Sequence, residues 1–478
     1  MSKSLPDLLM SFPTERVAID DGVQRETYGD LLSAARRISG WCAGQYGIGQ
    51  CVVIKARSTA AFFKAWLGVV HSGNVVVPVD PEMPNVALRH VLRKTRSARV
   101  LEPEEITAEA AQAASNRETI SNPDDVAMVM FTSGTTGSPK GVVMTNENLR
   151  HSWNAVSEYL GFANHASTIC TLPLYYSYGL ISQALCMLSV GGYVRLVDGM
   201  KNPLAFEKIV REEGIASFCG VPSSFSLLAR FHKIKALSMP SIKVVCSAGA
   251  AFDMSAYPLM KEVFPCAEIF NNYGMTEACP RISYVSDRDP MFLKGSCGAP
   301  MRGVELVTLD PESHEVLPDG IEGVLGIRGP NITRGYLDEP ERNRRAFQRD
   351  GYLVSGDFAG IVDGHLFIRG RSDDIFNVGG EKVAPIEIES PLNQMAGVAG
   401  SLVKGIHDSD RGQVPVAFLV LARSIEKREL DVFLSEHLVP AKIPVRYYEV
   451  SELPMTSNGK LKRSELSEAS PLVLRLIT

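Results

Sequence analysis

The sequence predicts an α/β protein with a large N-terminal domain of helix-covered sheets, a small β-barrel-like subdomain and a small α+β C-terminal domain. Apolar runs of strand length alternate with longer stretches that suit helices, and this alternation is typical of sheets covered by helices. The 478 residues are enough for two or more domains. The clearest strands are expected at residues 51–55, 75–79, 142–144 and 243–246, and the clearest helices at 58–71 and 254–264.

The later part of the chain indicates further sheets. Residues 323–330 and 364–369 are predicted to form strands of a second, antiparallel sheet. After Arg371 the pattern restarts, and ~105 residues with their own helices and strands suit a small separate domain. We therefore predict one domain at residues 1–371 and another at 372–478. The elements expected in the second domain are helices at 386–394 and 429–437, strands near 400–405 and 414–421, and a polar loop at 456–460.

The polar segment at residues 102–122 has no apolar stripe. It is expected to be a solvent-facing helix or a linker.

Composition excludes several classes of protein. The net charge of −5 provides no basic field for nucleic acid or an anionic membrane. No apolar run approaches the roughly 18 residues that a membrane helix needs, and the N-terminus lacks the layout of a signal peptide. The nine cysteines include no C-x-x-C pair, so we interpret them as reduced thiols of a cytoplasmic protein. With no His/Cys cluster, a structural zinc site is not expected.

One segment stands out chemically: residues 132–141 are Thr-Ser-Gly-Thr-Thr-Gly-Ser-Pro-Lys-Gly, after a strand-like stretch at 126–131. Backbone N–H groups, hydroxyls and Lys140 make it a candidate phosphate loop. It is not a Walker A motif, because Pro139 precedes the lysine, Gly141 follows it and the next element is a strand. A kinase or GTPase is therefore disfavoured. The plainer alternative is a functionless hairpin rich in small residues.

Later segments carry other groups suited to a nucleotide. Tyr273 offers an aromatic face for a purine. Thr276 and Glu277 add a hydroxyl and a carboxylate, and Mg²⁺ is commonly held by one or two carboxylates plus substrate phosphates. Asp357 suits a pair of ribose hydroxyls, and Arg371 has five donors for ribose and phosphate. Taken singly, each has a plainer explanation: a core tyrosine, a surface glutamate, a turn aspartate or a surface ion pair.

Taken together, the segments resemble the adenylate-forming superfamily, which includes acyl-CoA synthetases, nonribosomal-peptide adenylation domains and luciferases. The resemblance is to its acyl- or aryl-acid ligase branch. Order and spacing agree across nearly the whole chain, whereas any one segment alone would be weak. The matching segments are residues 132–141, 271–277 (Asn-Asn-Tyr-Gly-Met-Thr-Glu), 355–357 (Ser-Gly-Asp), 370–373 (Gly-Arg-Ser-Asp) and 454–460 (Pro-Met-Thr-Ser-Asn-Gly-Lys).

The resemblance implies ATP and Mg²⁺ as cofactors and a role for each matched residue. Thr276, Glu277 and Lys460 are the implied catalytic residues, with Thr276 at the α-phosphate and Glu277 holding the metal. Asp357 and Arg371 are implied to hold the ribose. The other implied nucleotide-binding residues are Thr132, Ser133, Gly134, Thr135, Thr136, Gly137, Lys140, Gly249, Ala250, Asn272, Tyr273 and Gly274.

The resemblance also implies a mobile C-terminal domain. Asp373 occupies the hinge position between an adenylating and a thioesterifying arrangement, and Lys460 is expected to serve only the first. Gly379 and Gly380 match the segment that approaches the thiol arm of CoA or phosphopantetheine. Lys382 stands where many members have arginine, which puts its phosphate contact in doubt.

The acid is the least determined partner. Residues 172–180 contain no aspartate to hold an α-ammonium, so an α-amino acid is disfavoured. Tyr175 and Tyr176 replace the Phe-His of many relatives, which leaves gating in doubt. Tyrosines with hydroxyl tips suit an aryl or a short, β-functionalised acid, although plain packing explains them equally well. The residues expected to line the pocket are Tyr176, Ser177, Tyr178, Val221, Ala248, Gly249 and Met275.

The function predicted from the sequence is an ATP-dependent acid–thiol ligase that forms an acyl-adenylate and pyrophosphate. The acyl group then passes to CoA or to the phosphopantetheine of a stand-alone carrier protein. The alternatives are a luciferase-like oxygenase, an amino-acid adenylation enzyme and a non-catalytic nucleotide-binding relative. No nucleic-acid or membrane partner is expected.

Overall fold

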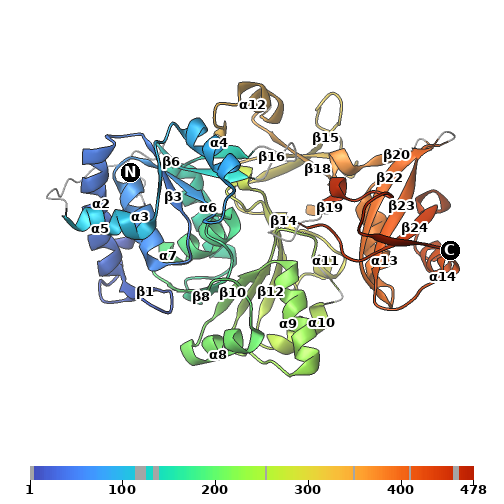
Figure 1. Cartoon of the computed structure of the whole chain (residues 1–478), viewed down its shortest axis with the longest axis horizontal. Helices are drawn as coiled ribbons and strands as arrows, with labels where there is room; N and C mark the ends of the chain where they lie inside the picture. Colours follow the sequence, from blue (N-terminus) through green and yellow to red (C-terminus); the bar gives the residue numbers. More distant parts are fainter. Residues whose placement is uncertain are drawn as a thin grey trace. The chain divides into compact units, whose positions relative to one another are not determined.

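A computed structural model of the chain describes residues 5–112, 125–132, 139–252, 254, 256–347, 350–379, 381–408, 411–455 and 462–478. The chain divides into two compact units (Figure 1). The larger unit comprises residues 1–306 and 327–354, and the smaller comprises 307–326 and 355–478. The predicted mixed α/β fold, with a large N-terminal and a smaller C-terminal part, is confirmed.

The larger unit contains a nine-stranded sheet in the order β14-β13-β12-β11-β10-β8-β9-β1-β2. Strands β12, β11, β10, β8, β9 and β1 run parallel to their neighbours, whereas β13, β14 and β2 are antiparallel additions at the two edges. The bounds are β1 Val17–Asp20, β2 Arg25–Thr27, β8 Ser167–Cys170, β9 Tyr193–Leu196, β10 Ser217–Gly220, β11 Val244–Ser247, β12 Glu268–Tyr273, β13 Ser283–Ser286 and β14 Ala299–Pro300.

The larger unit also contains a six-stranded sheet, in the order β17-β7-β6-β4-β3-β5. Strands β3 and β4 have the predicted bounds, because runs such as Val-Val-Val-Pro-Val are apolar on both faces and suit a buried parallel strand. The bounds are β3 Cys51–Lys55, β4 Val75–Val79, β5 Val100–Leu101, β6 Val126–Thr132, β7 Lys140–Thr145 and β17 Gly335–Tyr336.

Helices of varied length connect these strands. The predicted helices at 58–71 and 254–264 correspond to α3 and α10. The helices of the larger unit are α1 Leu5–Leu9, α2 Tyr28–Gln45, α3 Ala60–His71, α4 Asn85–Thr95, α5 Pro103–Gln112, α6 Asn146–Tyr159, η1 Tyr178–Leu185, α7 Cys186–Ser189, α8 Pro203–Glu213, α9 Pro222–Ile234, α10 Tyr257–Val263, η2 Thr276–Ala278, α11 Pro290–Leu293 and α12 Pro340–Ala346.

Helix α5 differs from the solvent-facing segment that the sequence predicts. Ile106 and Ala110 are buried, at 0% and 1% exposure, and the helix packs beside α2 and α3. These two residues are four positions apart and so share one helical face, which is too narrow an apolar stripe to stand out among polar neighbours. The remainder of the predicted segment, from residue 113, lies outside the described residues.

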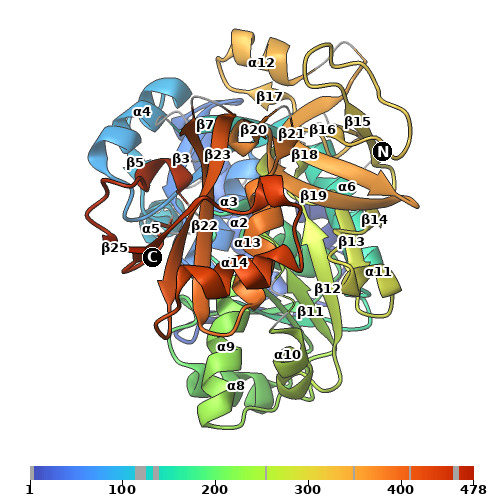
Figure 2. The same cartoon turned by 90° about the vertical axis from the view of Figure 1, so that its right-hand side faces the viewer.

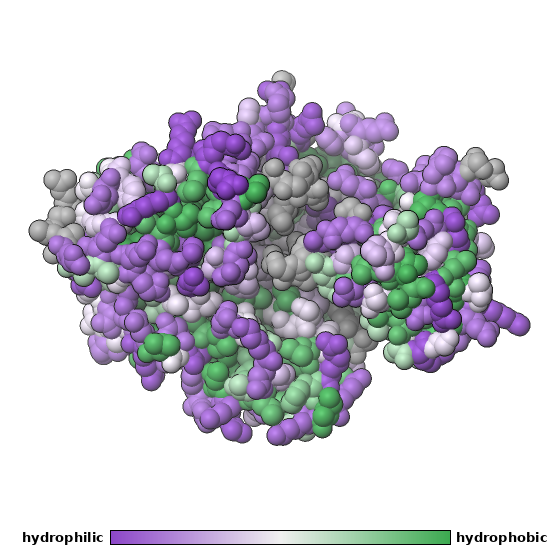
Figure 3. Space-filling model, in the orientation of Figure 1, coloured by the Kyte–Doolittle hydropathy of each residue, from purple (hydrophilic) through white to green (hydrophobic). Residues whose placement is uncertain are grey.

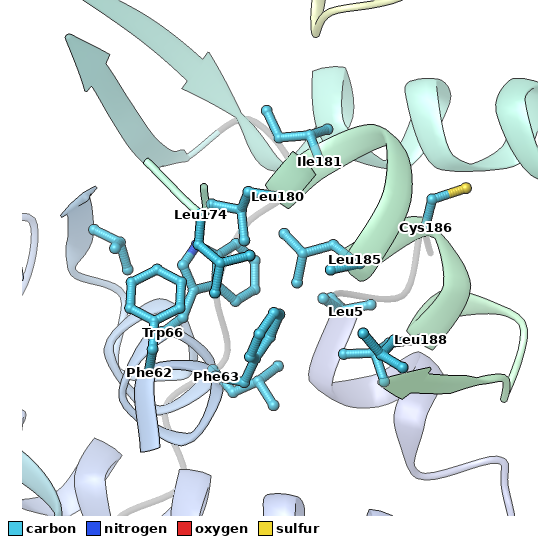
Figure 4. Close-up of a cluster of buried hydrophobic side chains, with 14 of the residues drawn as sticks. Leu5, Phe62, Phe63, Trp66, Leu174, Leu180, Ile181, Leu185, Cys186 and Leu188 are labelled. Atoms are coloured by element: carbon cyan, nitrogen blue, oxygen red, sulfur yellow. The ribbon is translucent and has the colours of Figure 1, made fainter. Parts of the chain in front are cut away.

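The main core of the larger unit anchors helix η1. Figure 4 shows apolar side chains of η1 facing the aromatic side chains of α3. Because η1 begins at Tyr178, the last residue of the tyrosine-rich segment 175–178, its burial fixes where that segment lies. The labelled residues of the cluster are Leu5, Phe62, Phe63, Trp66, Leu174, Leu180, Ile181, Leu185, Cys186 and Leu188.

The smaller unit contains a six-stranded sheet in the order β21-β20-β23-β24-β25, with β22 paired to β23. Helices α13 and α14 lie beside one another against this sheet (Figure 2). The apolar tail of the chain forms β25, which pairs with β24. The bounds are β20 Phe376–Val378, β21 Glu381–Val383, β22 Val398–Asp408, β23 Gly412–Leu421, β24 Arg446–Val450, β25 Val473–Ile477, α13 Pro385–Gln394, α14 Lys427–Ser435, η3 Ser372–Asp374, η4 Pro440–Lys442 and η5 Arg463–Glu465.

A four-stranded sheet has the order β15-β16-β18-β19, and its strands include the points where the chain passes from one unit to the other. The strands predicted at 323–330 and 364–369 correspond to β16 and β19. The bounds are β15 Glu305–Leu309, β16 Gly323–Arg328, β18 Leu353–Val362 and β19 His365–Arg371.

The visible surface is mixed, with hydrophilic side chains prominent and apolar ones in patches between them (Figure 3). Among the described residues, no helix has both the length and the apolar character needed to cross a membrane.

The start of α2 gives a stability prediction. Thr27 accepts a hydrogen bond from the backbone N–H of Asp30, and the Asp30 carboxylate accepts from the backbone N–H of Thr27. Thr27→Ala removes one half of this capping box and is expected to lower the free energy of unfolding by about 1 kcal/mol. Urea denaturation measures the change. Thr59, at the start of α3, makes no capping bond and is the matched control. An equal loss in Thr59→Ala would contradict the assignment.

Candidate active site

The predicted pocket residues follow the carboxyl ends of neighbouring parallel strands. Strand β10 lies between β8 and β11, and β11 lies beside β12, all parallel. Parallel neighbours end at the same edge of a sheet, where open α/β sheets bind their ligands. The segments that begin there are residues 171–178 after β8, Val221 after β10, Ala248–Gly249 after β11 and Gly274–Glu277 after β12.

Within this edge the tyrosines and the glycine turn are in contact. The rings of Tyr176 and Tyr178 meet edge to face, with centroids 6.2 Å apart. Gly249 has a φ of +91°, and a Cβ at this position would lie 2.8 Å from the Tyr176 hydroxyl oxygen. A side chain at residue 249 would therefore be both strained and displaced by Tyr176. Burial raises the pKa of both tyrosines, so both remain neutral phenols at physiological pH.

The turn that carries Thr276 and Glu277 is held tightly. A Cβ at Gly274 would lie 1.7 Å from the Pro280 carbonyl oxygen, so only glycine permits this closure. The hydroxyl oxygens of Thr276 and Ser177 are 2.9 Å apart and share a hydrogen bond. Two predicted segments, one after β8 and one after β12, are thus joined directly.

Glu277 is linked to a residue that the sequence analysis missed. The Tyr336 hydroxyl donates a hydrogen bond to Glu277 Oε1 at 2.8 Å. The same tyrosine ring lies 5.9 Å from Lys140 Nζ, and the Arg342 guanidinium lies 5.7 Å from it. Strand β17 positions Tyr336 opposite Val142 of β7. A predicted phosphate-contacting lysine and a predicted metal ligand are therefore arranged around one aromatic side chain.

Two buried asparagines hold this turn and the neighbouring segment at residues 330–332 in place. Asn331, at 0% exposure, donates through Nδ2 to the Ala278 and Arg281 carbonyls at 3.1 and 2.9 Å. Asn148, on α6, donates to the Pro330 and Ile332 carbonyls at 2.8 and 2.9 Å. These contacts connect α6, residues 330–332 and the Glu277 turn. The carbonyls that accept these bonds are 50 to 184 residues away in the sequence, so no local pattern predicts these contacts, although Asn148 also forms a capping box with Thr145.

The geometry suits a magnesium ion that shares its ligands with phosphate. Among the described residues, no group of three or more His, Cys, Asp or Glu side chains forms a self-sufficient metal site. Glu277 accepts one hydrogen bond at Oε1 and none at Oε2 from the described part of the chain. Mg²⁺ is commonly held by one or two carboxylates plus phosphate oxygens. Glu277 fits that role, with its orientation fixed by Tyr336.

The predicted phosphate loop comes between two antiparallel strands in the sequence. Strands β6 and β7 pair antiparallel, and Thr132 lies opposite Lys140 in the register. Ser133, Gly134, Thr135, Thr136 and Gly137 lie outside the described residues, so their predicted phosphate contacts stay predictions.

The adenine-side residues differ in exposure. Asn272 is buried; its Oδ1 accepts a hydrogen bond from the Tyr159 hydroxyl at 2.8 Å, and its Nδ2 donates to the Ser247 carbonyl at 3.2 Å. Tyr273 and Met275 are partly exposed at the sheet edge, and Ala250 is exposed. The predicted contacts of these residues with the nucleotide stay predictions.

The smaller unit brings together the two predicted ribose-binding residues. Asp357 on β18 lies opposite Arg371 on β19, with Oδ1 3.4 Å from Nη1. The Ser355 hydroxyl accepts a hydrogen bond from the Asp357 backbone N–H, and the Ser372 hydroxyl donates to the Gly356 carbonyl. Asp373 is exposed within η3, directly after this pair.

The remaining predicted residues lie at or beyond the limits of the described chain. Gly379 is exposed in the turn after β20, with its N–H donating to the Arg411 carbonyl at 2.9 Å. Gly380 and Lys460 lie outside the described residues.

A buried ion pair anchors the segment that follows residue 461. Arg463 Nη2 lies 2.8 Å from Glu389 Oε2, and its Nε lies 3.3 Å from Asp374 Oδ2. The Glu389 side chain is only 3% exposed and also accepts from the Val403 N–H at 2.7 Å. Arg463 thereby joins the chain at η5 to α13 and to Asp374, the residue next to Asp373.

Comparison with known proteins identifies the family. A sequence profile described as "AMP-binding enzyme" matches residues 9–337, and one described as "AMP-binding enzyme C-terminal domain" matches residues 387–460. The chain belongs to the AMP-binding enzyme family. The predicted membership of the adenylate-forming superfamily is thereby confirmed.

Several AMP-binding enzymes resemble this chain in sequence or structure. It is 30% identical over 357 residues to 4-coumarate–CoA ligase 2 of Nicotiana tabacum and 32% identical over 356 residues to 4-coumarate–CoA ligase 1 of Narcissus pseudonarcissus. Each match covers 72% of this chain but only 65% of the relative. ATP-bound MatB from Rhodopseudomonas palustris has a TM-score of 0.89 at 24% identity, covering 97% of this chain and 98% of the other. The o-succinylbenzoate CoA synthetase of Bacillus subtilis has a TM-score of 0.87 at 24% identity, covering 98% of each chain.

The Tyr336 hydroxyl is expected to strengthen binding of magnesium–ATP. Tyr336→Phe removes a hydrogen bond to a charged group, so the dissociation constant measured by calorimetry should rise roughly 10-fold. Tyr352→Phe is the matched control, because the Tyr352 hydroxyl also bonds to a glutamate, Glu305, within the larger unit. It should leave the constant unchanged. The same affinity in Tyr336→Phe as in wild type would contradict the role of Tyr336.

The buried ion pair of the smaller unit gives a stability prediction. Arg463→Met leaves Glu389 charged and buried, and should lower the local free energy of unfolding by about 3 kcal/mol. Hydrogen exchange of the smaller unit in the intact protein measures this loss. Arg475→Met breaks an exposed ion pair with Glu449 in the same unit and should cost less than about 1 kcal/mol. Equal losses in the two variants would contradict the prediction.

Proposed function

We propose that the protein is an ATP-dependent acid–thiol ligase that forms AMP. A carboxylate oxygen attacks the α-phosphorus of ATP, and the bond to pyrophosphate breaks to leave an acyl-adenylate. A thiolate then attacks the acyl carbon, and AMP departs. The observation that carries the proposal is the arrangement of Lys140 and Tyr336, from one sheet, around Glu277, whose turn follows one of four neighbouring parallel strands of another sheet.

Each charged group has a task in this reaction. Lys140 contacts the β- and γ-phosphates, and Glu277 holds Mg²⁺, which neutralises charge on the phosphates. Thr276 contacts the α-phosphate, with its hydroxyl oriented by Ser177. Asp357 and Arg371 bind the ribose. Lys460 supplies an ammonium beside two anions that must approach each other, which lowers the energy of the transition state.

We propose CoA as the first acceptor to test, because the relatives and structural neighbours are named as CoA ligases or synthetases. The phosphopantetheine of a carrier protein is the second. Asp373 acts as the hinge, and the glycines at positions 379 and 380 admit the thin thiol arm.

The proposed acid is aryl, or short and β-functionalised. Tyr176 and Tyr178 form aromatic walls that end in hydroxyls, and the segment from Leu172 to Leu180 has no acid to pair with an α-ammonium. Neighbours in sequence and structure are named for 4-coumarate and o-succinylbenzoate, both aryl acids.

The direct test is a screen of pyrophosphate release with aryl, short aliphatic and α-amino acids. We expect release with an aryl or short acid, AMP as the nucleotide product, and faster turnover when CoA or a phosphopantetheinylated carrier is added. Failure with every acid, although ATP binds, would favour the non-catalytic alternative. Oxygen uptake or light emission would indicate the oxygenase.

Lys460 is expected to serve adenylation alone. In Lys460→Ala, ATP–pyrophosphate exchange should fall at least about 100-fold, because removal of one preorganised electrostatic group typically has this effect. Turnover of a supplied acyl-adenylate with the thiol should stay near wild type. Lys462→Ala, which breaks an exposed pair with Glu465, is the matched control and should affect neither step. Equal losses of both half-reactions in Lys460→Ala would contradict the assignment.

A further inference from the structure

Arg281 is a buried arginine whose charge is not balanced. The residue is 1% exposed, and its Nε and Nη2 atoms have no hydrogen-bond partner in the described part of the chain. Among the described residues, no aspartate or glutamate forms an ion pair with it. A guanidinium carries five donors and stays protonated in proteins, and an unpaired charge away from water is strongly unfavourable. Such a group indicates an anion that is not part of the chain.

The position of Arg281 is fixed on both sides. Its carbonyl accepts the hydrogen bond from Asn331 Nδ2 at 2.9 Å, and its Cα packs against Gly274. The guanidinium carbon lies 4.3 Å from the centre of the Tyr178 ring. The Tyr178 hydroxyl donates to the Cys246 carbonyl at 3.0 Å, and burial raises the pKa of this phenol well above its ordinary value. Tyr178 therefore supports the guanidinium without neutralising it.

The guanidinium adjoins the expected acid pocket. Tyr178 packs against Tyr176, which is partly exposed and faces Gly249, and the guanidinium lies over the Tyr178 ring. Arg281 also follows the η2 turn that carries Thr276, where the reacting carboxylate is expected. Burial raises the pKa of Tyr176 and of Tyr178, and the nearby charge of Arg281 opposes that rise at both tyrosines.

We propose that Arg281 is the counter-ion for a second carboxylate on the substrate, which makes the acid a short dicarboxylic acid. This inference rests on the proposed function and specifies its substrate class. One carboxylate attacks the α-phosphate near Thr276, and the distal one enters past Tyr176 to pair with the guanidinium. Arginine binds a carboxylate through two parallel hydrogen bonds, which matches its two unpartnered nitrogens. Binding of the diacid balances the charge that the free protein leaves unpaired.

One group of the chain competes for the same guanidinium. Cys219 and Cys246 lie opposite each other on β10 and β11. The pKa of the Cys219 thiol is lowered, chiefly by a hydrogen bond from Cys246 and also by Arg281. A Cys219 thiolate would balance Arg281 without any ligand, and the experiment must separate these two anions.

The first arm uses the wild-type protein and pairs of acids that differ only in the distal charge. Succinate is compared with succinamate, and phthalate with phthalamate, by pyrophosphate release with magnesium–ATP. We expect kcat/KM to be about 30-fold or more higher for the diacid of the preferred pair, the effect of a buried charge pair. Equal or better turnover of the monoamides would overturn the inference while leaving the ligase function intact.

The second arm changes the guanidinium. Arg281→Met should abolish the preference for the diacid without weakening magnesium–ATP binding, and Arg281→Lys should retain part of it. Arg302→Met removes an exposed arginine of the same unit and is the matched control. Cys219→Ser should keep the preference. If Arg281→Met keeps the preference for the diacid, or if Cys219→Ser loses it, the inference is overturned, and the Cys219 thiolate is the counter-ion of Arg281.

Calorimetry of diacid binding in the presence of AMP needs no turnover. Saturable binding that weakens about 30-fold or more in Arg281→Met supports the anion site. If such binding occurs but no acid is activated, the proposed function fails while the anion site stands. Binding that is equal in the two proteins would overturn the inference.

Discussion

Parallel strands in one sheet must end at the same edge, and the arrangement of the larger unit depends on this constraint. Strands β8, β10, β11 and β12 begin at residues 167, 217, 244 and 268 and end beside one another. The chain that leaves each strand contributes one part of the candidate site. The connections are buried or tightly bonded where they leave the sheet, as at Ala248 and the Glu277 turn. The sheet therefore determines where the segments of the candidate site lie.

Long-range hydrogen bonds make the Glu277 turn more rigid than a typical surface turn. Tyr336 holds the carboxylate, Ser177 bonds to Thr276, and Asn331 bonds to the carbonyls that follow. A carboxylate with a fixed orientation loses little conformational freedom when it binds a metal ion, which favours binding. The same turn continues to Arg281, so the proposed metal ligand and the proposed distal anion site share one short segment.

Local patterns in the sequence predicted much of this molecule. The features that they did not predict depend on contacts between residues far apart in the sequence. The bounds of β3 and β4 followed from apolar runs, and Asp357 and Arg371 were both predicted and lie opposite each other. Tyr336 and Glu277 are 59 residues apart, and no periodicity or motif connects them. No feature of the sequence singled out Arg281, because only packing reveals that it is buried. Helix α5 was predicted to face solvent because the residues that bury one side of it, Pro103, Ile106 and Ala110, are too few to form a recognisable apolar stripe.

The central claim is that a carboxylate oxygen attacks the α-phosphorus of ATP at the Thr276–Glu277 turn. Its most direct test is the fate of oxygen-18 placed in the carboxylate of an accepted acid. The claim predicts AMP that carries one labelled oxygen after transfer of the acyl group to the thiol, with unlabelled pyrophosphate. Unlabelled AMP, or formation of ADP with label in inorganic phosphate, would contradict it.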